Sequence, residues 1–519
     1  MTRTHRLLAG VAALGLSASL TSLTLSAPTG VRAAPSRVGY QGTITMFAQG
    51  YNPPSATHAV SGQTVVNHNA LSKLAATWEK SHPGVTIKFV DLTATGGTND
   101  AYYTALRTRL TGGTAPDLFW MQSDVQASDP YLRSGLILDL TPYLNGPNKY
   151  IPGNRRWNDA FQPPWQTYGR NTSDRYATVP QDIVSTGVYY NKAITDKLHL
   201  RMPPASWAEF LQDQQTIKNA GYLAMYGPSY CLVKCHWYWT AIGSQFMLGE
   251  QAALASLTYH PDYVPGVVTA EDWARAVTKK HYLLSTDPGF IAATRNLKEW
   301  SQSWAPGWAS DTTGDTKGQQ LFASGRLAFF WDGTWLLPTL NQLKLPFSFG
   351  SFWYPPVTRA TSPQAPARPQ TPPGVGCICG VSYAAPASLA HSPKLPLVLD
   401  WLQYITAPTN DATIVNEHPA SLPVTKGAAA APAIASLFKG EAVTVKYGGQ
   451  FPISPPFQAL APDDTDAWYR DTVLYLQGAT SERDYLVQLD DLMAHSAREL
   501  IAQNDKTKSK SGTWDLTKW

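Results

Sequence analysis

Charged residues are scarce in this sequence. They make up 15% of its 519 residues, and the formal net charge is +4. A balance this close to neutral gives no electrostatic basis for binding nucleic acid or an anionic membrane surface. Familiar catalytic motifs are missing as well, because no GxSxG, HExxH, GxGxxG or Walker loop occurs. We therefore expect a protein that is not an enzyme and uses no cofactor.

Long hydrophobic runs are confined to the N-terminus. A basic start over residues 3–6, an apolar core over Leu7–Leu16 and a small-x-small site at Val31–Ala33 are typical of an export signal. We expect residues 1–33 to be removed as a signal peptide. A membrane anchor is the alternative, but the apolar core is short and soon becomes rich in Ser and Thr. The predicted mature chain is a soluble monomer in the periplasm or outside the cell.

Cysteine is rare, and its four copies form two close pairs: Cys231 and Cys235, Cys377 and Cys379. Outside the cytoplasm such residues most often form disulfides, and four cysteines allow three connectivities. A bridge between Cys377 and Cys379 would be strained, which favours bridges between the two pairs. A zinc site built from both pairs is the alternative.

Aromatic residues are plentiful, with 18 Trp and 25 Tyr, and 43% of the residues are hydrophobic. A chain this long suggests two or three lobes. Much of the aromatic surface belongs in a core, but this much Trp also suits a surface that stacks on flat ligands.

The first part of the mature chain alternates between strand and helix patterns. The expected elements are a strand at 43–48, a helix at 70–81, a strand at 85–90, a helix at 99–110 and a strand at 117–121. This order predicts a parallel sheet with crossover helices, and such sheets bind ligands beyond the carboxyl ends of their strands. Candidate ligand contacts are therefore Phe47 and Gln49 after the first strand, and Gln122, Ser123 and Asp124 after the third. A plain polar loop is an equally good interpretation of the last three.

The rest of the chain continues in the same manner. We expect strands at 184–191 and 327–331, and helices at 206–220 (capped by Ser206), 297–304, 395–406 and 484–503, with another helix ending over 319–324. The Pro-rich stretch 358–373 is expected to be an exposed loop. The polar residues from 505 onward are expected to be peripheral.

Several segments resemble a known family when they are taken in order. They are LTGGTAPDLFWM (110–121), GLILDLTPYL (135–144), YATVPQDIVSTGVYYNKAI (176–194), PPASWAEFL (203–211), LFASGRLAFFWDGTWLLPTL (321–340) and GVSYAAPASLAHSPKLPLVLDWLQYITAP (380–408). They are similar to motifs of the family 1 extracellular solute-binding proteins of ABC importers, which are maltose-binding-protein-like. The resemblance covers most of residues 40–500. The lack of a lipobox Cys, the Cys pairs and the Pro-rich stretch depart from the family pattern.

The resemblance implies an α/β periplasmic-binding-protein fold, in which two lobes trap a ligand in the cleft between them. The implied crossover segments lie near 179–183, 315–319 and 376–381. The N-terminal lobe would then contain 36–180 and 317–376, the C-terminal lobe 183–315 and 378–505, and the polar tail 506–519.

The resemblance also implies that the chain captures a carbohydrate, in particular an oligosaccharide, by hinge closure and delivers it to a membrane permease. A sugar offers an apolar face to aromatic rings and a hydroxyl rim to polar side chains. Trp331, Asp332 and Trp335 supply both kinds of group after one strand. Gln181 and Asp182 lie at the first crossover and Tyr383 just after the third. Trp237 and Trp239 alternate as in a strand and would share one face. A core role is the alternative for each of these Trp residues.

Two other classes of function stay open at this point. A secreted carbohydrate-active enzyme could use the same aromatic cleft, although no carboxylate pair stands out. A member of the same family could bind a polyamine, which needs several cleft carboxylates, or a glycerophosphodiester, which needs a cleft arginine.

Overall fold

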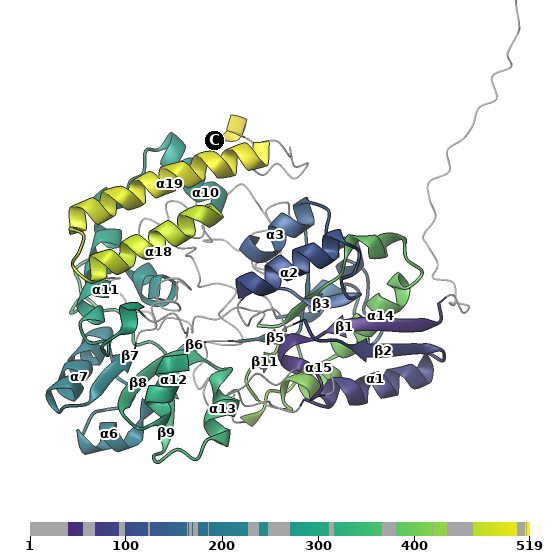
Figure 1. Cartoon of the computed structure of the whole chain (residues 1–519), viewed down its shortest axis with the longest axis horizontal. Coiled ribbons are helices and arrows are strands. Elements are labelled where there is room, and N and C mark those ends of the chain that lie inside the picture. The colour runs from purple at the N-terminus through teal and green to yellow at the C-terminus, as the bar shows by residue number, and fades with distance from the viewer. Residues whose placement is uncertain are drawn as a thin grey trace, which may run out of the picture. The chain divides into compact units, whose positions relative to one another are not determined.

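The strands in the described part of the chain form three sheets in this computed structural model (Figure 1). The structure describes residues 40–54, 68–92, 99–122, 125–162, 165, 169, 175–184, 186–226, 238–247, 270–310, 316–365, 380–417, 419–432, 460–505, 514 and 516–519. The first sheet has the order β2 (Val85–Phe89), β1 (Gly42–Phe47), β3 (Leu118–Trp120), β10 (Ser382–Ala384), β4 (Val179–Pro180). The second has the order β7 (Leu223–Tyr226), β8 (Leu327–Gly333), β6 (Thr186–Asn191), β9 (Phe349–Phe352). A two-stranded sheet pairs β11 (Leu422–Pro423) with β5 (Asp182–Ile183).

The helices follow the strands in the order that an α/β chain requires. In and around the first sheet they are α1 (Ala70–Ser81), α2 (Asn99–Thr111), α3 (Val125–Arg133), α4 (Thr141–Leu144), α14 (Leu395–Ile405) and α15 (Pro408–Val415). The others are α6 (Lys192–Lys197), α7 (Trp207–Asn219), α8 (Ser244–Phe246), α10 (Ala270–Lys279), α11 (Pro288–Ser301), α12 (Thr316–Ala323), α13 (Leu336–Gln342), α18 (Pro462–Leu476) and α19 (Glu482–Asp505). Short helical turns are η1 (Gln49–Tyr51), η4 (Trp157–Ala160), η6 (Trp239–Gly243), η7 (Leu284–Thr286), η8 (Trp308–Ser310), η9 (Ala387–His391) and η11 (Leu516–Lys518).

The parallel sheet predicted for the first part of the chain is confirmed. β1 pairs in parallel with both β2 and β3. The helix before β3, α2, ends at Thr111, and Gly113 in the turn after it has a φ of 66°, a left-handed conformation that glycine adopts without strain. Asp117 then enters the sheet, and its Oδ2 accepts hydrogen bonds from the Thr45 amide at 2.8 Å and from Lys394 at 3.0 Å. The Pro-Asp step therefore ties β3 to β1 and to the segment before α14.

Packing in the second sheet explains why its strand sequences are so apolar. All seven residues of β8 are buried, because β7 and β6 flank it and helices cover it. The predicted cap of α7 is present, since the Ser206 hydroxyl accepts a hydrogen bond from the Glu209 amide at 3.2 Å. The helix expected at 297–304 begins earlier, because Asp287 caps α11 by accepting from the Gly289 and Phe290 amides.

The assignment of segments to the two sheets differs from the sequence-based expectation. Segment 317–376 was expected with the N-terminal strands, yet β8 and β9 both pair with β6 in the second sheet. Segment 378–505 was expected in the other lobe, yet β10 pairs with β3 and β4 in the first sheet. The expected crossover near 315–319 falls where α12 begins, and α12 packs on β8. This correction moves β8 and β9 to the second sheet and β10 to the first, while the end of segment 378–505 stays with the second sheet, because Trp468 of α18 and Leu489 of α19 share a hydrophobic core with Val188 of β6.

The end of the chain also corrects an expectation. Trp514 was placed in a peripheral polar tail, but its side chain is buried against Ala274 of α10 and Ala497 of α19. The Glu271 carboxylate accepts hydrogen bonds from the Trp514 amide at 2.7 Å and from the Trp519 indole at 3.0 Å. Two aromatic residues thus anchor a stretch whose composition is otherwise polar. No described helix combines the length and the apolar character that crossing a bilayer demands.

Truncation after Asp505 is expected to lower the free energy of unfolding by about 3 kcal/mol. The loss combines the apolar area that Trp514 buries with a Glu271 carboxylate left without its two donors. Urea unfolding followed by circular dichroism would measure the loss, with Thr517→Ala as the control for a change at an exposed tail position. An unchanged midpoint in the truncated chain would show that this segment adds nothing to stability.

Candidate functional site

One edge of the first sheet collects five of the predicted ligand contacts. The parallel strands β1, β2 and β3 end there, and the antiparallel pairing of Ser382 with Pro180 brings the start of β10 and the end of β4 to the same edge. Phe47, Gln122 and Gln181 therefore follow or end strands at this edge, as do Gln49 and Asp182 a few residues on. Open α/β sheets bind ligands at such an edge.

Aromatic rings that sequence reasoning missed pack behind this edge. The Phe47 ring lies 5.6 Å from the Tyr102 ring, which lies 5.0 Å from the Trp120 ring. Tyr103 accepts a hydrogen bond from the Gln122 amide at 3.0 Å and holds the end of β3. Phe47 is 1% exposed, so it supports the edge from the core. The two consecutive Tyr residues in α2 are the sequence feature that could have indicated these rings. The sequence does not reveal, however, that they lie over β3.

Two polar residues predicted beside this edge behave differently. Gln49 is exposed and has a φ of 48°, and its Oε1 accepts the Gly50 amide at 2.5 Å. Gln122 is half-buried. The Gln49 side chain is therefore accessible to a solute, and the Gln122 side chain is partly accessible.

Asp182 is buried and hydrogen-bonded to several chain segments, so it is not available to bind a ligand. Its Oδ2 accepts a hydrogen bond from the Tyr51 hydroxyl at 2.6 Å, and its Oδ1 accepts one from the Val381 amide at 2.8 Å. The residue is 2% exposed. Asp182 therefore joins two chain segments to the loop after β1 and leaves no oxygen for a solute.

Gln181 and Asp411 form the second half of this buried group. Gln181 donates from Nε2 to Asp411 Oδ1 at 2.8 Å, and the Thr425 amide donates to Asp411 Oδ2 at 2.8 Å. We call Gln181, Asp182 and Asp411, with the Val381 and Thr425 amides, the crossover clamp. Tyr383 lies beside it, fully buried, and its hydroxyl has no hydrogen-bond partner among the described residues.

Burial dominates the electrostatics of the crossover clamp. It raises the pKa of Asp182, although hydrogen bonds from Tyr51 and the Val381 amide act in the opposite direction. It raises the pKa of Asp411 to about 7, a value that the hydrogen bonds from Thr425 and Gln181 reduce only in part. Burial, followed by the charge of Asp182, raises the pKa of the Tyr383 hydroxyl well above its ordinary value. The structure thus places two carboxyl groups in one desolvated cluster.

The second sheet offers an edge of a different character. β7 and β8 are parallel and end on the same side, and the start of β6 joins them because Thr186 pairs with Gly333. A small hollow at this edge is lined by uncharged residues: Thr186, Gly187, Tyr189, Thr334, Ser351, Phe352 and Trp353. The Thr186 and Tyr189 hydroxyls among them are already hydrogen-bonded, to the Tyr354 hydroxyl at 2.8 Å and to the Gly333 carbonyl at 3.0 Å, so the hollow is mainly apolar.

Residues 331–335 (WDGTW), at the end of β8, include both buried and exposed side chains. Trp331 is 0% exposed, and its ring lies 4.0 Å from that of Tyr354. Asp332 is also buried, and it accepts hydrogen bonds from the Gly333 amide at 2.6 Å and from Gln319 Nε2 at 3.2 Å. Trp335 is 39% exposed. Of these three residues, Trp335 is the one that presents its ring to a solute.

Gly333 is required by the position of that ring. A Cβ atom at Gly333 would lie 2.2 Å from the Trp335 ring, well inside contact distance. The indole therefore lies directly over the backbone at the end of β8. The Tyr189 hydroxyl, which donates to the Gly333 carbonyl at 3.0 Å, holds this backbone from the other side.

The expectation that Trp239 lies in a strand is wrong. Residues Trp239–Gly243 form a π-helical turn, and not a strand with alternating faces. Trp239 is 0% exposed and stacks on Phe290 at 4.8 Å. A short apolar run is compatible with either a buried helix or a strand, and periodicity alone does not distinguish them. Here the segment packs into the core as a helical turn.

Several predicted positions lie outside the described residues: Ser123, Asp124, Trp237, Cys231, Cys235, Cys377 and Cys379, and the signal-peptide range 1–33. In the part of the chain that the structure does describe, no group of three His, Cys, Asp or Glu side chains is placed to hold a metal ion.

Comparison with known proteins identifies the family. Residues 64–412 match the family described as Bacterial extracellular solute-binding protein, and the chain belongs to it. No curated protein matches the chain.

Solved structures share the two-lobed solute-binding fold at low sequence identity. The GacH receptor of Streptomyces glaucescens, studied unliganded and with acarbose, has a TM-score of 0.58 and 17% identity, and the match covers 89% of this chain and 99% of that one. A family 1 extracellular solute-binding protein from Bifidobacterium longum subsp. infantis has a TM-score of 0.56 and 17% identity over 88% and 100%. An ABC substrate-binding protein from Listeria monocytogenes, in complex with cycloalternan, has 0.55 and 15% over 88% and 98%.

Proposed function

We propose that this chain captures a carbohydrate, in particular an oligosaccharide, and delivers it unchanged to the permease of an ABC importer. The observation that carries the proposal is the exposed Trp335 ring over Gly333, at the edge of the second sheet where the parallel strands β7 and β8 end. An aromatic ring stacks on the C–H face of a sugar, and hydroxyl side chains bond its rim.

The charge of the hollow narrows the class of solute. None of its lining residues is charged, which suits a neutral ring. Polyamine binding is disfavoured, because Asp182 and Asp332, the carboxylates that would serve it, are buried and bonded within the protein. The solutes named for two of the related structures, acarbose and cycloalternan, are saccharide compounds and agree with this proposal.

Capture by closure requires two bodies and flexible links between them. We assign the first sheet and residues 380–432 to one lobe, and the second sheet and residues 460–505 to the other. The links are the segment from β4 to β6, the segment from β9 to β10, and the chain after β11. The protein acts as an exported monomer in this scheme, with its N-terminal 33 residues removed.

Intrinsic tryptophan fluorescence of the mature chain, titrated with a panel of solutes, tests the proposal. The panel contains acarbose, cycloalternan, maltose and xylose oligomers, with spermidine and glycerophosphocholine as the two non-sugar arms. We expect a saturable shift with at least one oligosaccharide and none with the non-sugar arms.

The sugar recovered from each titration is analysed by chromatography. Intact sugar is the expected result. Hydrolysed sugar would overturn the proposal in favour of a carbohydrate-active enzyme. A shift with spermidine or glycerophosphocholine alone would replace the sugar with that solute class.

A further inference from the structure

The crossover clamp joins the three segments that link the two sheets. Asp182 lies in the first link and accepts from the Val381 amide of the second. Asp411 accepts from Gln181 of the first link and from the Thr425 amide at the start of the third. Two carboxyl groups therefore connect every link that a change in lobe arrangement must bend.

Both protonation states of Asp411 find hydrogen-bond partners in this arrangement. The ionised group accepts from Gln181 Nε2 and from the Thr425 amide. In the structure, Gln181 Oε1 has no partner among the described residues. If the Gln181 amide turns over, this oxygen faces Asp411. The protonated carboxyl group can then donate to it while keeping the hydrogen bond from the Thr425 amide. Asp411 thus keeps two hydrogen bonds in both states, and one buried Gln181 group, Oε1 or Nε2, lacks a partner among the described residues in each.

The groups that face Asp411 act on its negative charge in opposite directions, because Asp182 repels it while hydrogen bonds from Thr425 and Gln181 stabilise it. Asp182 on β5 carries a charge of the same sign, and the Tyr383 hydroxyl on β10 interacts with both carboxyl groups. Gln181 in the first link and Thr425 after β11 are polar but do not titrate. The Tyr51 hydroxyl, on the loop after β1, reaches the group through Asp182.

We propose that Asp411 is a positioning residue for solute capture, which binds one proton when the crossover clamp is formed and releases it when the links change conformation. The coupling to capture rests on the proposed function. The proton-binding site itself does not rest on the proposed function, because it is a property of the protein without sugar.

The direction of the effect follows from burial. The pKa of Asp411 is about 7 in the clamp against 3.8 for a solvated carboxyl. The clamp therefore binds the proton more tightly than an arrangement in which Asp411 meets water. Protonation favours the clamp at low pH, and this advantage is lost as the pH rises from 4 through 7.

Hydrogen exchange of the full mature chain without sugar, resolved by peptide at pH 5 and pH 8, tests the proposal. After correction for the intrinsic rate, we expect exchange of the Thr425 amide to rise roughly ten- to hundredfold at the higher pH. Peptides from β6 in the same sample should show no such rise. In Asp411→Asn the difference should vanish, because the amide accepts from Thr425 and pairs with a turned Gln181.

Asp213→Asn is the matched control. Asp213 is also buried and has a pKa raised to about 6, chiefly by burial, but it lies on α7, which packs on β7 of the second sheet. Its replacement should leave the Thr425 difference intact. An equal loss in Asp213→Asn, or no pH difference in the unmodified chain, would overturn the proposal even if Asp411→Asn failed to fold.

The coupling to capture is read separately, from protons taken up or released when a panel sugar binds, by calorimetry in two buffers of different ionisation enthalpy. Uptake or release that disappears in Asp411→Asn is expected. A sugar that binds without proton exchange would overturn the coupling. Absence of sugar binding with the Thr425 difference present would count against the proposed function and leave the proton site standing.

Discussion

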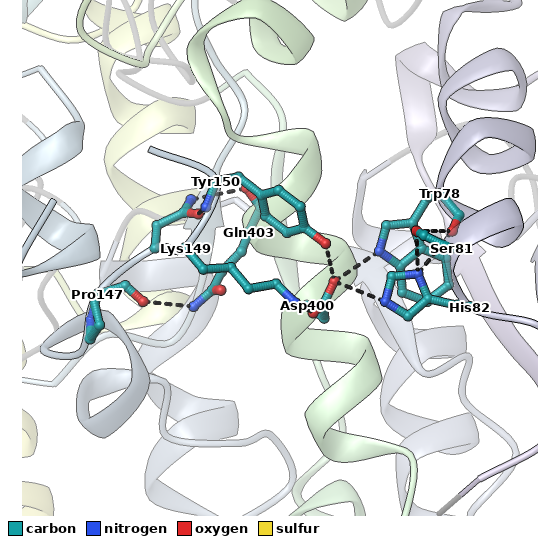
Figure 2. Close-up of polar contacts among 9 residues, drawn as sticks. Trp78, Ser81, His82, Pro147, Lys149, Tyr150, Asp400 and Gln403 are labelled. Carbon is teal, nitrogen blue, oxygen red and sulfur yellow. Dashed lines mark hydrogen bonds and ion pairs between the residues drawn. The ribbon is translucent and has the colours of Figure 1, made fainter. Parts of the chain in front are cut away.

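Replacement of Asp400 by alanine is expected to lower the free energy of unfolding by about 3 kcal/mol. Asp400 lies on α14 at the centre of the network in Figure 2. Its Oδ1 accepts hydrogen bonds from the Trp78 indole at 2.9 Å and from the Tyr150 hydroxyl at 2.5 Å. Alanine would leave the buried Trp78 indole and the half-buried Tyr150 hydroxyl without their acceptor, which costs more than a bond between exposed groups.

A lysine and a histidine add to the network. Lys149 forms an ion pair with Asp400, and His82 Nε2 lies 3.5 Å from its Oδ1. The His82 ring stacks on that of Trp78 at 3.8 Å (Figure 2). One carboxylate thus fastens α1 and the segment before η4 to α14. Asp400→Asn, which keeps one acceptor oxygen, should lose less than Asp400→Ala.

Asp159 provides the matched control for Asp400. It faces Arg156 at 3.7 Å, and both side chains are about half exposed, at 49% and 48%. Asp159→Ala is therefore expected to change stability by less than about 1 kcal/mol. Guanidinium unfolding of the three variants makes the comparison, and equal losses in Asp400→Ala and Asp159→Ala would contradict the role given to the network.

Replacement of Trp335 by alanine is expected to weaken binding of a panel sugar by roughly 10- to 100-fold, which corresponds to about 1.4–2.8 kcal/mol. Because the ring is 39% exposed, its removal should lower the unfolding midpoint less than removal of a fully buried indole would. Fluorescence titration for affinity and thermal unfolding for stability measure the two quantities on the same sample.

Trp331→Ala is the contrasting variant from the same segment. Trp331 is 0% exposed and packs on Tyr354 and Trp300, so its loss creates a cavity and should cost about 3–5 kcal/mol of stability. An affinity loss in Trp331→Ala with no loss of stability would show that the two indoles have exchanged roles.

The sequence predicted what depends on local patterns. The helix at 70–81 and the strands around 85–90 and 184–191 were predicted almost to the residue, because periodic apolar positions and clear stop signals delimit them. The turn at Gly113 followed from the same signals. These features require only a few neighbouring residues, all of which the sequence displays.

Features that depend on contacts between residues far apart in the sequence could not be predicted from it. Nothing local says that β8 pairs with β6, that Asp411 meets Gln181, or that Trp514 folds back on α10. For the same reason Trp331 and Trp335, four residues apart, could not be told apart before their packing was known. The aromatic content pointed to a stacking surface, and only burial shows which ring remains open.

Fluorine NMR of the chain labelled with 5-fluorotryptophan tests the central claim most directly, with the Trp335 resonance assigned from Trp335→Phe. During titration with an oligosaccharide that binds, the account predicts that the Trp335 resonance shifts in a saturable, one-to-one manner, that the Trp331 resonance moves less, and that the sugar is recovered intact. A Trp335 resonance that stays in place while the sugar binds would contradict the site, and cleaved sugar would contradict the function.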